Sequence, residues 1–157
     1  PRSHLKLLAV LLVLAAGCHS GGGDFVAPAS PEAAVRGFLS AVKANSMTAM
    51  ADLWGSENGP ASRTMTGSEA KRTEMEQRLT VMRIYLEHEK FDLLPPNDAL
   101  TQANGKRRVD VRLQRRGCTP VVSFTAVRAG NGWLVGDIDL SAAGNPALPC
   151  RPASQGR

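Results

Sequence analysis

Aromatic side chains are scarce in this sequence: its 157 residues include two Trp, one Tyr and four Phe. None of them falls between the basic residues of 106–108 and 112–116, which form the most basic stretch of the chain. Proteins that bind single-stranded nucleic acid interleave cations with stacking aromatic rings, so we predict no nucleic-acid partner. This basic stripe is interpreted as a solvated face, with contact to an anionic lipid or polysaccharide as the alternative.

Motifs for metal, nucleotide or redox chemistry are also missing. There is no C-x-x-C pair, and the three histidines lie far apart, at positions 4, 19 and 88. The glycine-rich stretch 55–60 lacks the Lys-Ser/Thr ending of a phosphate-binding loop. We therefore predict no catalytic residue, no metal ligand and no cofactor site.

The longest apolar run is short. It covers residues 7–16 and follows the basic residues Arg2, His4 and Lys6. A helix that spans a bilayer needs about 20 apolar residues, whereas a run of this length is typical of the hydrophobic region of a signal peptide. Residues 1–17 are therefore predicted to be a cleavable leader.

Small residues lead from this run to the first cysteine, in the order Leu-Ala-Ala-Gly-Cys at 14–18. This stretch resembles a lipobox, although Ala15 stands where leucine is commoner. The resemblance implies a lipoprotein signal peptide cut before Cys18, whose thiol carries a diacylglycerol and whose acyl chains, such as palmitate, enter the membrane. An ordinary secretory leader is the alternative. Residues 18–29 would then be the lipidated cysteine and a flexible tether.

The residue after the cysteine is His19, not Asp. By resemblance to enterobacterial sorting rules, this favours the outer membrane, facing the periplasm, over the inner membrane. If Cys18 is acylated, Cys118 and Cys150 remain in an oxidising compartment, where an isolated pair is expected to join. We predict a disulfide that closes a loop of about 33 residues, with a reactive thiol as the alternative.

Helical patterns fill the first half of the remaining chain. Ser30 followed by Pro31 predicts a helix start, and Asn45 or Ser46 is expected to cap a short second helix. Ser68 begins a third helix that should run to about Glu89. Residues 55–67 are predicted to be a loop. The buried side of the third helix is predicted from its spacing to be Met75, Leu79, Met82 and Leu86.

The pattern then changes to an alternation of period two. It predicts strands over 90–94, 106–114, 121–128 and 133–140, with a hairpin turn at 129–132. Helices followed by an antiparallel meander indicate an α+β fold, with three N-terminal helices packed on a curved antiparallel sheet of about four strands.

This order, with Ser-Pro-Glu-Ala-Ala-Val-Arg-Gly-Phe-Leu at 30–39 and Gly-Trp-Leu-Val-Gly-Asp-Ile-Asp-Leu at 132–140, resembles the nuclear-transport-factor-2-like superfamily. It is also similar to small bacterial lipoproteins of unknown function with that fold. The resemblance covers about residues 30–142 and implies a cone-like sheet wrapped around helices. One such domain is expected over 30–150, with a flexible tail at 151–157. If the cone holds a pocket, the candidate lining residues are Phe38, Trp54, Tyr85 and Trp133; the alternative places them in the core.

Enzymes of that superfamily place an Asp–His or Asp–Tyr pair in the cone, for which Asp137, Asp139, His88 and Tyr85 are the candidates here. The two aspartates lie two residues apart, so they share a strand face. The opposite face carries Leu134, Ile138 and Leu140 and is expected to meet the helices. We therefore predict that both aspartates are exposed.

Arg108 or Arg112 is expected to lie beside these aspartates. His88 is expected in the last turn of the third helix, where the helix dipole is sufficient to explain a histidine. The leading hypothesis is a non-enzymatic binding or assembly module at the membrane. A small-molecule enzyme with an acid/base pair in the cone and a structural cell-envelope lipoprotein are the alternatives.

Overall fold

The structure, a computed structural model, describes residues 25–96 and 104–150. The predicted leader at 1–17, the lipidation of Cys18 and the predicted tail at 151–157 lie outside the described residues.

Three helices begin where the sequence predicts. They are α1 (Pro31–Lys43), α2 (Met47–Leu53) and α4 (Glu69–Tyr85). Each starts after a serine whose hydroxyl accepts a hydrogen bond from a backbone N–H three residues on; these serines are Ser30, Ser46 and Ser68. Because the first amides of a helix have no partner within it, such caps fix where each helix begins.

The predicted end of the third helix is wrong, since α4 stops at Tyr85 and not near Glu89. The amide of Glu89 donates to the carbonyl of Gln114 at 2.8 Å, so that residue already belongs to the sheet. The plain loop predicted over 55–67 is also wrong. It contains a short two-stranded ladder, β1 (Gly55–Ser56) and β2 (Gly59–Pro60), and a single helical turn, α3 (Ala61–Thr64).

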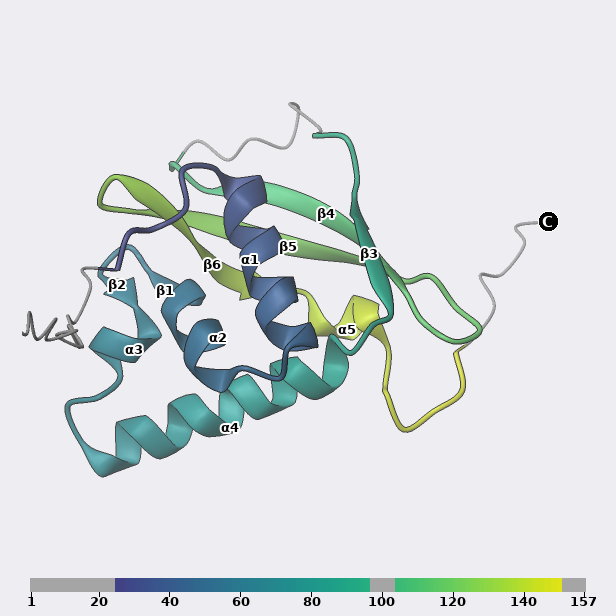
Figure 1. Cartoon of the computed structure of the whole chain (residues 1–157), viewed down its shortest axis with the longest axis horizontal. Helices are drawn as coiled ribbons and strands as arrows, with labels where there is room; N and C mark the ends of the chain where they lie inside the picture. Colours follow the sequence, from purple (N-terminus) through teal and green to yellow (C-terminus); the bar gives the residue numbers. More distant parts are fainter. Residues whose placement is uncertain (1–24, 97–103, 151–157) are drawn as a thin grey trace, which may run out of the picture.

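The predicted four-stranded antiparallel sheet is confirmed. Its strands are β3 (Lys90–Leu93), β4 (Arg107–Gln114), β5 (Val121–Ala129) and β6 (Gly132–Ile138), and they pair in that order. α1 packs against β4, β5 and β6, and α4 packs against α2 and against α5 (Leu140–Ala143), a short turn after the last strand (Figure 1). The α+β class is therefore correct.

The space between α1 and the sheet is filled by apolar side chains. Phe38 and Leu39 of α1, together with Val111 and Phe124 of the sheet, are fully buried. Side chains of α2 and α4, Met50 and Leu79 among them, continue the same cluster. Three members of the stripe predicted for the third helix are buried, although Leu86 lies just past the end of α4, and the fourth, Met82, is half-buried.

An irregularity in β6 corrects one prediction about side-chain facing. Phe124 pairs with Ile138 but Ala126 pairs with Val135, so β6 carries one extra residue, Gly136. Such a bulge swaps the two faces of a strand. Leu134 therefore shares its face with Asp137 and not with Ile138 as predicted. A Cβ on Gly136 would lie 2.6 Å from the Cγ1 of Val127, so a larger residue does not fit there without a shift.

Candidate ligand-binding cleft

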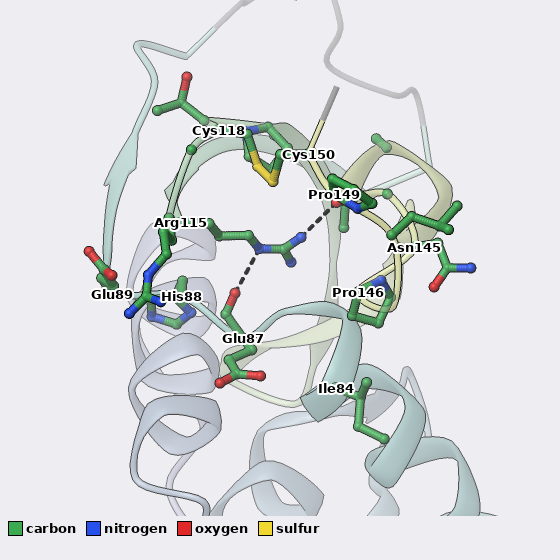
Figure 2. A pocket seen from close by; sticks show the side chains of 18 of the residues that line it. Ile84, Glu87, His88, Glu89, Arg115, Cys118, Asn145, Pro146, Pro149 and Cys150 are labelled. Atoms are coloured by element: carbon green, nitrogen blue, oxygen red, sulfur yellow. Dashed lines mark hydrogen bonds between the residues drawn. A yellow bond between two sulfur atoms is a disulfide. The ribbon is translucent and has the colours of Figure 1, made fainter. Parts of the chain in front are cut away.

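A large cleft lies at one end of the domain, away from the interior of the sheet. Its volume is about 1110 Å³, and three segments line it: 84–89 at the end of α4, 115–121 from the end of β4 to the start of β5, and 142–150 from α5 onward. They meet at the right-hand end of Figure 1, and Figure 2 shows the cleft from close by. Segments so far apart in sequence form this cleft only in the folded chain.

Arg115 crosses the cleft and joins its walls (Figure 2). Its Nε donates to the carbonyl of Glu87 and its Nη1 to the carbonyl of Ala143, both at 2.7 Å, while its Nη2 donates to the carbonyl of Tyr85. Burial lowers the pKa of Arg115, and the carboxylate of Glu87 acts in the opposite direction. A cation among the last carbonyls of a helix also interacts favourably with the helix dipole.

His88 lies at the edge of this cleft, just beyond α4, so its predicted place in the last helical turn is wrong. The ring is buried, and its Nδ1 lies 2.7 Å from the carbonyl of Leu86. Nδ1 must therefore carry the proton and donate it, which leaves Nε2 with a lone pair in the neutral ring. Nε2 is buried and has no hydrogen-bond partner within 25–96 and 104–150.

The surroundings of His88 favour its neutral form. Burial lowers the pKa of the imidazole, the hydrogen bond to Leu86 opposes this, and the nearby charges of Lys43 and Arg115 lower it further. The ring also meets Phe91 edge-on, with 5.4 Å between ring centroids. His88 is therefore a neutral acceptor near pH 7.

The disulfide predicted between Cys118 and Cys150 is present, with 5.5 Å between the Cα atoms. It ties the far wall of the cleft, residues 145–150, to the turn between β4 and β5. Within the described chain, the hydrogen bonds of this wall run from Ala147 and Leu148 to Asn145 and so stay inside it. The disulfide is thus the main link between this wall and the rest of the domain.

None of the four predicted pocket-lining aromatic residues borders this cleft. Phe38 and Trp54 belong to the main core, and Trp133 packs in a small cluster with alanines of α1 and β5. Tyr85 is half-buried at the end of α4, where its backbone carbonyl accepts from Arg115.

Asp137 and Asp139 are both exposed, as predicted. Asp139 caps α5 by accepting from the amide of Ala142. The hydrogen bond from the Ser141 hydroxyl makes the largest contribution to lowering the pKa of Asp139, and the charge of Arg108 adds a small one. Neither aspartate lines the cleft, so neither meets His88 there.

The basic stripe does not form one surface. Arg108 makes an ion pair with Asp110, at 2.8 Å, and Ser123 donates to the same carboxylate. Burial raises the pKa of Asp110, but the hydrogen bonds from Arg108 and Ser123 outweigh it and hold that pKa below its usual value. Arg115 instead points into the cleft. The solvated-face interpretation therefore holds only for part of the stripe.

In the part of the chain that the structure describes, no group of three or more His, Cys, Asp or Glu side chains could hold a metal ion. Over the same residues, no helix is long and apolar enough to cross a membrane. No protein-family model, curated protein or solved structure matches the chain.

Proposed function

We propose that this chain is a lipid-anchored protein of the bacterial cell envelope whose single domain binds a ligand in the cleft and is not an enzyme. The diacylglycerol is carried by Cys18, in the outer membrane and facing the periplasm, and the domain is a nuclear-transport-factor-2-like cone. The ten apolar residues and the small residues before Cys18 support the anchor. The disulfide supports an oxidising compartment.

The observation that carries the proposal is the position of the cleft relative to the N-terminal entry of the chain. Figure 1 shows the described chain beginning at the left-hand end of the long axis, whereas the cleft segments lie at the right. The entry is fixed there, because the amide of Trp133 at the start of β6 donates to the carbonyl of Pro28 at 2.9 Å. A tether that enters at this end holds the mouth of the cleft away from the membrane.

The lining of the cleft supports binding over catalysis. Acid/base catalysis needs side chains that are free to exchange protons with a substrate. Here Arg115 is held by three backbone carbonyls, and the Nε2 of His88, the ring nitrogen that could accept a proton, is buried and has no hydrogen-bond partner in the described ranges. No hydrogen bond joins the side chains of two ionisable residues that line the cleft in the described ranges.

Two variants test the proposal in cells. Cys18→Ser should leave the leader uncleaved or release the protein from membranes, and unchanged processing and detergent partitioning would rule out the anchor. A photo-crosslinking residue in place of Leu148, on the cleft wall, should yield a discrete adduct. The same residue in place of Val81, exposed on α4 but outside the cleft, should not. Equal adducts from both positions would refute binding at the cleft.

A further inference from the structure

The charged side chains that line the cleft balance one another. Two arginines, Arg115 and Arg116, face two carboxylates, Glu87 and Glu89. His88 adds no charge near neutral pH, because burial lowers its pKa. Three of the five N–H groups of Arg115 already donate to backbone carbonyls, which weakens its ability to bind a carboxylate or phosphate. An ionic ligand would therefore meet as much repulsion as attraction.

Apolar side chains gather at the rim. Ile84, Val121 and Leu148 are 40%, 41% and 63% exposed, and all three line the cleft. They are three of the five large hydrophobic side chains that are exposed in the described residues. Apolar groups that cluster around a concavity, and are not scattered singly, indicate a place where apolar surface is buried on binding.

One polar atom of a residue that lines the cleft has no partner in the described chain. The Nε2 of His88 is a buried lone-pair acceptor, since the proton of the ring is on Nδ1 and bonded to Leu86. A buried acceptor without a donor costs free energy, and a ligand that supplies the donor recovers it. The complementary group is an O–H or N–H without charge.

Access to Nε2 requires a small rearrangement, because the atom is buried in this conformation. The cleft as a whole can widen at the wall formed by residues 145–150, because the hydrogen bonds of this wall are internal and the disulfide is its link to the turn before β5. A shift of this wall breaks no hydrogen bond to the sheet.

We propose that the cleft binds an uncharged amphiphile, whose apolar body packs against Ile84, Val121 and Leu148 and whose hydroxyl group donates to the Nε2 of His88. This inference rests on the proposed function, because it names the ligand class of the same cleft. The volume of about 1110 Å³ is sufficient for a small molecule.

Ligands that share one apolar chain and differ in the head group test this class. The full chain, purified with its disulfide intact, is loaded with the neutral dye Nile red, and decanol, decyl methyl ether, decanoate and decylamine are compared as competitors. Decanol should displace the dye at about fivefold lower concentration than the ether, because one hydrogen bond separates them. It should bind about tenfold more tightly than either ion, because each ion must be desolvated among balanced charges.

Three variants locate the site. His88→Asn keeps a donor for the carbonyl of Leu86 but removes the Nε2 acceptor, so decanol should bind no better than the ether. Ile84→Asp should weaken the binding of both uncharged competitors, decanol and the ether. Its matched control is Val81→Asp, three residues earlier on α4, where the side chain is 46% exposed but outside the cleft. This variant should bind each competitor as tightly as the wild type does.

A second measurement does not depend on how His88→Asn folds. In protein with ¹⁵N-labelled histidine, and with His4 and His19 replaced by Gln, decanol should shift the Nε2 resonance of His88 and the ether should not. An unshifted resonance, or a decanol preference that survives in His88→Asn, would refute the hydroxyl contact.

The remaining outcomes separate the two proposals. Tighter binding of decanoate or decylamine than of decanol would overturn the ligand class but leave binding at the cleft intact. Binding of no competitor, or equal weakening by Ile84→Asp and Val81→Asp, would overturn both the ligand class and the proposed binding function.

Discussion

Arg115→Met removes the guanidinium that joins β4 to the end of α4 and to α5, while it keeps most of the aliphatic stem. Three backbone carbonyls, those of Tyr85, Glu87 and Ala143, lose their donor. Each such hydrogen bond contributes about 0.5–1.5 kcal/mol net. Because the side chain is only half-buried, part of this is recovered by water, and we expect the free energy of unfolding to fall by about 2–3 kcal/mol.

Urea unfolding followed by circular dichroism measures this change. The midpoint should shift to lower urea, while the slope of the free energy of unfolding against urea stays the same, because unfolding exposes the same amount of surface in both proteins. Arg116→Met is the matched control: the neighbouring arginine is exposed and makes no hydrogen bond within the described chain, so its loss should cost less than about 0.5 kcal/mol. If the two variants unfold at the same urea concentration, Arg115 does not join the walls of the cleft.

Three further perturbations have outcomes fixed by the structure. The pKa of His88 is lowered from 6.5, so its contribution to stability is complete above about pH 6.5 and is lost as the pH falls, because the unfolded chain then binds a proton that the folded ring resists. Unfolding midpoints compared across this range should fall more steeply in the wild type than in His88→Asn, and parallel curves would contradict the assignment. Cys150→Ala should speed hydrogen exchange after Leu140 and leave the sheet protected; uniform loss of protection would mean that the disulfide holds the whole fold. Asp137→Asn should change the free energy of unfolding by less than about 1 kcal/mol in urea titrations, because the carboxylate is exposed; a larger loss would indicate a partner that the exposed position does not explain.

Helix starts were predictable because their cause is local. Ser30, Ser46 and Ser68 each cap a helix with their own hydroxyl, and the residues that they bond lie three positions away. The end of α4 was not predictable in this way. The chain leaves the helix where the amide of Glu89 finds the carbonyl of Gln114, a partner 25 residues further on.

The strands show the same difference between features with a local cause, which the sequence predicts, and features with a long-range cause, which it does not. Alternation of apolar and polar residues predicts β4 and β5 to within a residue or two, since period two is a local property. The extra residue at Gly136 comes from the register between β5 and β6, which alternation alone does not reveal. It moves Leu134 to the face of Asp137, although the predicted exposure of Asp137 is correct.

Most of the residues that form the cleft are not connected by any pattern in the sequence. Cysteine parity predicts the bond between Cys118 and Cys150, but not that it builds a wall of the cleft. In the sequence, Arg115 is only one of several basic residues. In the folded chain, it donates to three backbone carbonyls. His88 follows a helix, and no pattern in the sequence shows that its Nε2 is buried without a partner in the described chain. One sequence feature does indicate the cleft. It is segment 145–150, which contains two prolines, follows the last strand and ends at Cys150.

The central claim is that Cys18 becomes the lipid-bearing first residue of an envelope protein. Intact mass spectrometry of the protein extracted from bacterial membranes tests it most directly. We predict one species that begins at Cys18, carries a diacylglycerol and keeps Cys118 bonded to Cys150. A membrane-extracted species that retains residues 1–17, or one that begins at or before Cys18 with an unmodified thiol, would contradict it.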